Sequence, residues 1–184
     1  MSMHKLASII VRNTDSLLMS SFIGLATVGV YSNYRLILNA LNNLINKFSV
    51  AFSGSIGNLA ALENSDWLYK VYKEMDFMFY VMSAYLTGGL MMLFNPFITL
   101  LFGGEYCFPM TTVVIIVVEF YISRMRQANL LFREAMGLFW NDRYKAVVES
   151  IINLVASLVL VQRYGVTGIV GGTIISTLCT CTWV

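Results

Sequence analysis

Apolar residues fill almost the whole chain in stretches of about twenty, the length that a helix needs to cross the hydrocarbon core of a bilayer. Only 12% of the 184 residues are charged, about half the share that is usual in a soluble domain, whereas 58% are hydrophobic. The remaining polar residues are too few to cover a water-soluble surface. A net charge of +2 also excludes a basic nucleic-acid-binding module. The composition therefore predicts an integral membrane protein.

Short connections with turn residues separate these apolar stretches, for example at Gly24 and at Tyr164-Gly165. Asn95-Pro96 is expected to end the third span, so that Phe97–Phe102 forms a short interfacial segment. We therefore expect an all-α fold: a polytopic integral membrane helix bundle of about six transmembrane helices, with residues 1–184 in a single transmembrane domain. The predicted spans are Lys5–Ile23, Val28–Asn58, Asp76–Phe94, Met110–Phe132, Ala146–Gln162 and Thr167–Val184.

Positive charges favour one orientation of this bundle. If alternate connections lie on the same side, one side collects Arg163, and the other collects Lys5, Lys70, Lys73, Arg143 and Lys145. Short loops rich in lysine and arginine stay in the cytoplasm. We therefore predict a multi-pass protein of the cytoplasmic (inner) membrane with both termini in the cytoplasm. The chain stops at Trp183-Val184 directly after an apolar stretch, so we expect it to be a fragment of a larger protein.

Residues for metal binding and bond chemistry are scarce. The chain has three cysteines, without a C-x-x-C pair, and one histidine, which cannot supply the four ligands of a structural zinc site. It also lacks a phosphate-binding glycine loop, a Ser/His/Asp set and an H-E-x-x-H motif. We therefore expect no metal, no cofactor and no enzymatic activity, and no nucleic acid among the partners.

The second predicted span carries a polar stripe on one helical face. At 100° per residue, six side chains project within roughly 80°, backed by aliphatic residues on the opposite face. Such a stripe suits a helix that borders a water-filled cavity, where amides bind sugar hydroxyls as well as water. Hydrogen bonding between neighbouring helices is the alternative. We favour the cavity because the amides are so many. The stripe consists of Arg35, Asn39, Asn42, Asn46, Ser49 and Ser53.

Charged residues inside the spans define two further groups. Asp15, Arg35 and Glu119 are expected at a similar depth, roughly 10–15 Å below the outer surface at 1.5 Å per residue. Asp15 and Arg35 belong to consecutive antiparallel helices, so they are candidates for an ion pair that is either structural or functional. Arg124, Arg126 and Arg133 lie closer to the cytoplasm and outnumber the nearby acids. They predict a cationic patch that receives an anion.

Several segments resemble a known family. They are RNTDSLLMSSFIGLATVGVYSNYRLI (Arg12–Ile37), FNPFITLLFGGEY (Phe94–Tyr106), REAMGLFWNDRYKAVVESIINL (Arg133–Leu154) and RYGVTGIVGGTIISTL (Arg163–Leu178). They are similar to flippases for lipid-linked oligosaccharides in the multidrug/oligosaccharidyl-lipid/polysaccharide exporter superfamily. The resemblance covers almost the whole chain, and the segment from Asp15 to Tyr34 is its most specific part.

The resemblance implies a transporter of two lobes that alternates access between the leaflets. It would move undecaprenyl-pyrophosphate-linked oligosaccharide outward during surface polysaccharide biosynthesis. Six spans match only the C-terminal lobe, so the implied partners are the cargo, membrane lipids and a missing N-terminal lobe of six helices. Arg35, Arg124 and Arg126 are the implied cargo-binding cations, with Asn39, Asn42 and Asn46 beside them and with Asp15 and Glu119 as coupling or ion-pair residues.

Two other functions remain open at this point. A small-molecule or drug exporter of the same fold would favour acids and aromatics in the cavity. A membrane polysaccharide polymerase or ligase component would need an external loop with catalytic residues, and the longest external connection, Phe94–Met110, has one acid and no base.

Overall fold

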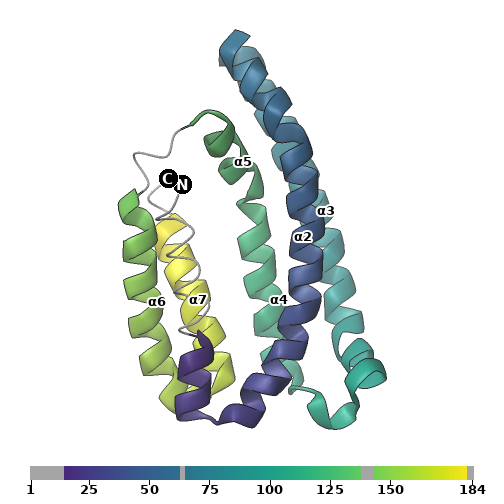
Figure 1. Ribbon diagram of the computed structural model, residues 1–184, viewed down its shortest axis with the longest axis vertical. Helices are drawn as coiled ribbons and strands as arrows, with labels where there is room; N and C mark the ends of the chain where they lie inside the picture. Colours follow the sequence, from purple (N-terminus) through teal and green to yellow (C-terminus); the bar gives the residue numbers. More distant parts are fainter. Residues whose placement is uncertain (1–14, 63–64, 138–142, 182–184) are drawn as a thin grey trace.

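The computed structural model describes residues 15–62, 65–137 and 143–181, and these fold into helices without a strand (Figure 1). Residues 15–22 are helical and precede a turn at Gly24. The all-α class is therefore confirmed for the described part of the chain. The further elements are α2 (Leu25–Leu62), α3 (Ser65–Phe102), the short 3-10 helix η1 (Gly104–Tyr106), α4 (Met110–Met125), α5 (Gln127–Ala135), α6 (Arg143–Tyr164) and α7 (Val166–Cys181).

The helices run roughly along one axis and form two groups. Helices α2 and α3 lie on one side, the hairpin of α6 and α7 lies on the other, and α4 stands between them (Figure 1). Helix α4 packs on α3 and on α7, whereas α5 packs on α2 and α3. The α4–α5 segment therefore joins the two groups. The upper ends of α2 and α3 project beyond the other helices (Figure 1).

Two described helices are long and apolar enough to cross a membrane: Asp66–Phe102 and Val147–Tyr164, with Val166–Thr180 as a shorter apolar helix. A core helix of a soluble protein would be mostly buried, yet only 22% and 17% of the apolar windows of the two long helices are buried. Tyr85, Met92 and Leu100 of α3 are 80–82% exposed. Soluble monomers rarely expose apolar surface on this scale, so these faces indicate membrane association.

Helices α2 and α3 are longer than the spans predicted for them. Each has 38 residues, about 57 Å at 1.5 Å per residue, against a hydrocarbon core of about 30 Å. The expected break at Asn95-Pro96 is wrong, because α3 continues through Pro96 to Phe102. A proline removes one helical hydrogen bond, and neighbouring groups in a packed bundle compensate for it. The helix ends instead at Gly103, whose φ of 104° favours glycine.

Contacts of Asn95 with α2 support the continuous helix. The hydroxyl of Tyr34, a fully buried side chain of α2, donates to Asn95 Oδ1 at 2.6 Å and accepts the N–H of Phe108 at 2.9 Å. Asn95 Nδ2 donates to the carbonyl of Phe108 at 3.2 Å. The Tyr34 ring packs against Phe94 and Phe108. This cluster joins α2, the residues of α3 just before the proline, and the segment after η1.

The fourth predicted span, Met110–Phe132, is also wrong as a continuous helix. It divides at Arg126, whose φ of −85° and ψ of 0° leave the helical region between α4 and α5. Helix α4 alone has 16 residues, about 24 Å. The predicted start at Lys5, the turn around Trp140 and the end at Trp183-Val184 lie outside the described residues.

Helices α6 and α7 form the most closely packed pair. Gly165, with a φ of 56°, makes the turn between them. A Cβ at Gly168 would clash with the backbone carbonyl of Leu160, and one at Gly172 would clash with the Ser157 hydroxyl. Both positions therefore need glycine for the two backbones to approach, as small residues do in membrane helix pairs.

We predict that Gly168→Ala destabilises the protein by about 1–3 kcal/mol, because the added methyl group meets rigid backbone. Gly89→Ala is the matched control in α3, since nothing lies within 4 Å of its Cβ position. The measurement is thermal unfolding in detergent micelles. Equal stability of both variants would contradict the tight α6–α7 approach.

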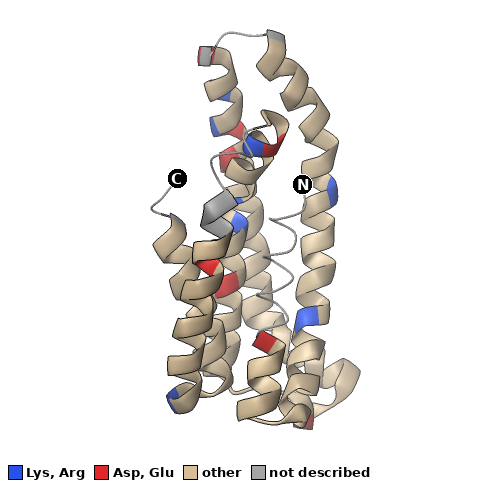
Figure 2. Cartoon of the chain, turned by 60° about the vertical axis from the view of Figure 1, so that its left-hand side comes forward, with Lys and Arg blue, Asp and Glu red and all other residues tan. Residues whose placement is uncertain are grey.

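Lysine and arginine residues gather mainly toward the upper end in Figure 2. Lys70 and Lys73 lie in the first turns of α3 at this end, whereas Arg163 lies at the opposite end of α6, beside the turn at Gly165. The predicted orientation would place the upper end in the cytoplasm.

We expect a cysteine at Gly104, and not one at Lys70, to react with an impermeant thiol reagent in intact cells. The background would lack the native cysteines. Gly104 accepts a side chain because the nearest atom to its Cβ position is a Thr99 methyl group at 3.9 Å. Equal labelling at the two sites would contradict the predicted orientation.

Candidate functional site

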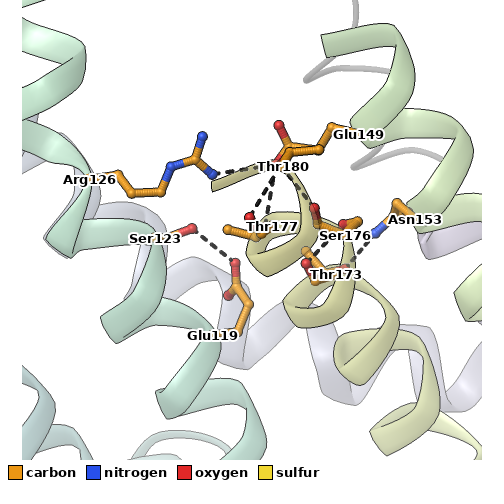
Figure 3. A network of polar contacts seen from close by, with 9 residues as sticks. All are labelled: Glu119, Ser123, Arg126, Glu149, Asn153, Thr173, Ser176, Thr177 and Thr180. Atoms are coloured by element: carbon orange, nitrogen blue, oxygen red, sulfur yellow. Dashed lines mark hydrogen bonds and ion pairs between the residues drawn. The ribbon is translucent and has the colours of Figure 1, made fainter. Parts of the chain in front are cut away.

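Polar side chains of α4, α6 and α7 meet inside the bundle and form one network, which we call the polar seam (Figure 3). Arg126, at the end of α4, points across to Glu149 on α6, and their side chains lie 3.5 Å apart from Nη1 to Oε1. Thr177 of α7 donates to the same carboxylate oxygen at 3.3 Å. The pair is partly enclosed, with exposed fractions of 18% for Arg126 and 25% for Glu149.

Deeper in the seam, Asn153 lies one turn below Glu149 on α6 and is 1% exposed. Its Nδ2 donates to Thr173 Oγ1 at 2.9 Å, while its Oδ1 is buried without a hydrogen-bond partner among the described residues. Ser176 and Thr180 donate to backbone carbonyls of α7. Helix α7 thus presents a hydroxyl-rich face to the carboxylate and the amide.

On the α4 side, Glu119 accepts a hydrogen bond from Ser123 at 3.4 Å (Figure 3). Glu119 also interacts electrostatically with Arg35 of α2 and with Asp15. Glu119 therefore belongs to a second group of charges, which we call the Arg35 cluster, about two helical turns from Arg126 along α4.

The Arg35 cluster contains two carboxylates and one guanidinium. Asp15 is 6% exposed, and its Oδ1 has no hydrogen-bond partner among the described residues. Arg35 lies within electrostatic range of both Asp15 and Glu119. Its guanidinium carbon is 5.8 Å from the centre of the Tyr31 ring, a cation–π distance. The structure thus brings together the three residues that the sequence placed at one depth.

Side chains at the α4–α5 break point in two directions. Arg126 reaches α6, whereas Arg124 Nη1 donates to Gln127 Oε1 at 3.2 Å. Gln127 in turn donates from Nε2 to the hydroxyl of buried Ser49 on α2 at 3.0 Å. Two of the three arginines of the predicted patch therefore contact different neighbours: Arg126 contacts α6, and Arg124 contacts α5.

Arg133 adds positive charge near this break. Burial lowers the pKa of its guanidinium from the ordinary value, and the positive charge of Arg126 lowers it further, whereas Glu134 opposes the shift. An arginine remains charged at neutral pH under such shifts. The neighbouring arginines therefore give this end of the seam a positive potential.

The amide stripe of α2 flanks the face that packs into the bundle. Tyr34, Leu38 and Ile45 are buried, while Asn42 is half-buried and Asn39 and Asn46 are exposed. Asn42 Oδ1 is buried without a hydrogen-bond partner among the described residues. An open groove of about 400 Å³ lies along this side and is lined by Asn43, Asn46, Lys47 and Val50. Asn39 lies one turn from Arg35 on the same helix, so these two members of the stripe remain neighbours.

Sequence reasoning missed the partners on α6 and α7. Glu149 is a charged residue in an apolar stretch, and such a residue is a sequence signal for a functional or paired site. Thr173, Ser176, Thr177 and Thr180 recur at helical spacing on α7, so their common face was available as well. The described residues contain no group of three or more His, Cys, Asp or Glu side chains that could hold a metal ion.

Comparison with known proteins gives no relative: no family model, no curated protein and no solved structure matches the chain.

We predict that Asp15 and Arg35 are energetically coupled. In the full chain, Asp15→Asn and Arg35→Gln should each destabilise the protein, since each leaves the opposite charge without its partner. The double variant should cost less than the sum by about 0.5–3 kcal/mol, measured by thermal unfolding in micelles. Glu105→Gln, an exposed acid of η1, is the control and should be additive with Arg35→Gln. Additivity of Asp15→Asn would show that the two charges act independently.

Proposed function

We propose that the chain is one lobe of a membrane transporter that moves lipid-linked oligosaccharide outward across the cytoplasmic membrane for surface polysaccharide biosynthesis. The observation that carries the proposal is the line of charges from the Arg35 cluster through Glu119 to the polar seam. It lies inside a helix group whose long outer helices expose apolar side chains. The sequence resemblance to flippases of the exporter superfamily supports the same function.

The cost of intramembrane charge favours transport over a purely structural role. Each charged side chain at the middle of a membrane helix costs roughly 2.5–3.5 kcal/mol on insertion scales. Apolar contacts, and close approaches at glycines such as Gly168, already pack these helices against one another. A series of five charges within one bundle is therefore better explained by a cargo or ion path. Those charges are Asp15, Arg35, Glu119, Arg126 and Glu149.

Arginine at the inner end favours an anionic cargo. The guanidinium binds phosphate oxygens through two parallel N–H donors, and Arg124, Arg126 and Arg133 gather where α4 ends. The exposed amides Asn39 and Asn46 offer donors and acceptors for sugar hydroxyls. Cargo with a pyrophosphate group and a sugar portion would use both sets.

The α2 stripe also favours a partner lobe. Exposed amides at membrane depth are unfavourable against lipid tails, so they require a polar surface or water opposite them. The missing N-terminal lobe of six helices is the proposed partner, with the cargo cavity between the two lobes.

An exporter of small cations is the second candidate, because one observation favours it. Asp15 and Glu119 supply two carboxylates beside the aromatic ring of Tyr31, an arrangement that suits an organic cation. Arg35 lies among these groups and repels such a cargo. We therefore rank the anionic cargo first.

We expect the triple variant Arg35→Gln, Arg124→Gln and Arg126→Gln to lose most transport without loss of membrane abundance. Each hydrogen bond to a charged phosphate contributes about 1.5–3 kcal/mol, so one lost contact should weaken cargo binding roughly ten- to a hundredfold. The corresponding Arg→Lys triple should retain part of the activity, since the charge remains while the planar fork is lost. The measurement is complementation of surface polysaccharide display in a flippase-deficient strain.

Arg163→Gln is the control for this experiment, because Arg163 is exposed at the opposite end of α6. Full display from the triple glutamine variant at normal abundance would refute an anionic-cargo role. Drug resistance lost by Asp15→Asn, with display intact, would favour the cation exporter instead.

A further inference from the structure

The break between α4 and α5 has no local cause in the sequence. Residues 120–132 contain neither proline nor glycine, which are the common causes of a sharp interruption in a helix. Nothing in this stretch prevents a continuous helix from Met110 to Phe132, and apolar periodicity predicts one. The interruption at Arg126 must therefore be maintained by contacts with other helices.

Two side-chain contacts flank the break, and they join it to helices on opposite sides. The Arg126–Glu149 pair holds the end of α4 against α6, and the Gln127–Ser49 hydrogen bond holds the start of α5 against α2. The packing of the backbone changes at the break: α4 packs on both α3 and α7, whereas α5 packs on α2 and α3. At the break the chain therefore passes from α4, which contacts α7, into the α2–α3–α5 group, whose helices pack on one another.

The geometry of the Arg126–Glu149 pair suits a contact that opens. The pair has one 3.5 Å approach instead of the two short parallel hydrogen bonds of a strong arginine–carboxylate pair. Both side chains are partly exposed, with exposed fractions of 18% and 25%. Thr177 fixes the carboxylate through Oε1, so that the acid stays on the α6–α7 side when the arginine leaves.

We propose that the Arg126–Glu149 pair is a latch that an anionic cargo group opens. A phosphate group binds Arg126 in place of Glu149, the tie to α6 is lost, and the α2–α3–α5 group separates from α6 and α7 at the upper end. This inference rests on the proposed function for the identity of the anion, while the latch itself concerns only these two side chains. Cargo binding and opening of the bundle would then be one event.

The test measures the distance between the two groups. Spin labels at Met136, which follows α5, and at Ile151 of α6 occupy exposed positions on opposite sides of the latch. The full chain, without its native cysteines, is reconstituted in lipid nanodiscs, and the distance distribution is measured by pulsed electron resonance. Glu149→Gln should raise the ratio of open to closed molecules about tenfold. This change lies between the effect of breaking an exposed ion pair and that of breaking a buried one. Glu105→Gln, in η1, is the matched control and should leave the ratio unchanged.

Exchange of the two charges keeps the latch testable even where Glu149→Gln fails to fold. The double variant Arg126→Glu with Glu149→Arg should restore the closed distribution. Inorganic pyrophosphate should open the wild-type protein in the same direction as Glu149→Gln and should leave Arg126→Gln unaffected. A closed distribution in Glu149→Gln, or an open one in the exchanged variant, would overturn the latch.

Failure of the latch and failure of the proposed function give different results. If the latch responds to both charge changes but pyrophosphate has no effect, opening by an anion is overturned. If the latch fails while complementation still depends on the three arginines, only this inference is lost and the transporter proposal stands.

Discussion

A charge inside a membrane helix is stable only when another charge, a dipole or water compensates it, and this constraint organises the interior of the bundle. Arg35 has Asp15 and Glu119 within electrostatic range, and Arg126 has Glu149. The hydroxyls of α7 complete the compensation, since Thr177 donates to Glu149 and Thr173 accepts from Asn153. These pairings add to the apolar packing of the helices, because each pair joins two different helices.

Much of the fold could be predicted from the sequence because membrane helices carry their signal locally. Apolar runs of suitable length identified α6 and α7 within a few residues, and the all-α class follows from the same runs. The errors arose where tertiary contacts override local chemistry. Pro96 predicts an end to α3, yet Asn95 is held by hydrogen bonds with Tyr34 and Phe108, and the helix continues. Arg126 interrupts a stretch without proline or glycine, and its side chain and that of Gln127 contact different helices.

The candidate site was also predictable in part, because some of its geometry is encoded locally along each helix. Depth along each helix can be counted from the sequence, and that count placed Asp15, Arg35 and Glu119 at one level. Rotation of a helix about its axis cannot be counted in this way unless its buried face is known. The count therefore gave no means of choosing between Arg124 and Arg126 as partners of α6, and it left Glu149 without an assigned neighbour. The amide stripe of α2 was recognised as a polar face, but its exposure depends on what packs against that side.

The distribution of charge along the bundle also bears on the direction of the proposed transport. Around Arg35 the carboxylates of Asp15 and Glu119 outnumber the single guanidinium. Around the α4–α5 break the guanidiniums of Arg124, Arg126 and Arg133 outnumber the carboxylates of Glu149 and Glu134. If the upper end faces the cytoplasm, an anionic cargo meets its most favourable potential where it enters and a less favourable one deeper in the bundle. Low affinity at the deeper level promotes release outward, since a transporter that bound its cargo equally at both levels would gain nothing from moving it. The excess of acid around Arg35 is therefore a useful property in an exporter of anions, and its cost is limited because Arg35 neutralises part of the charge.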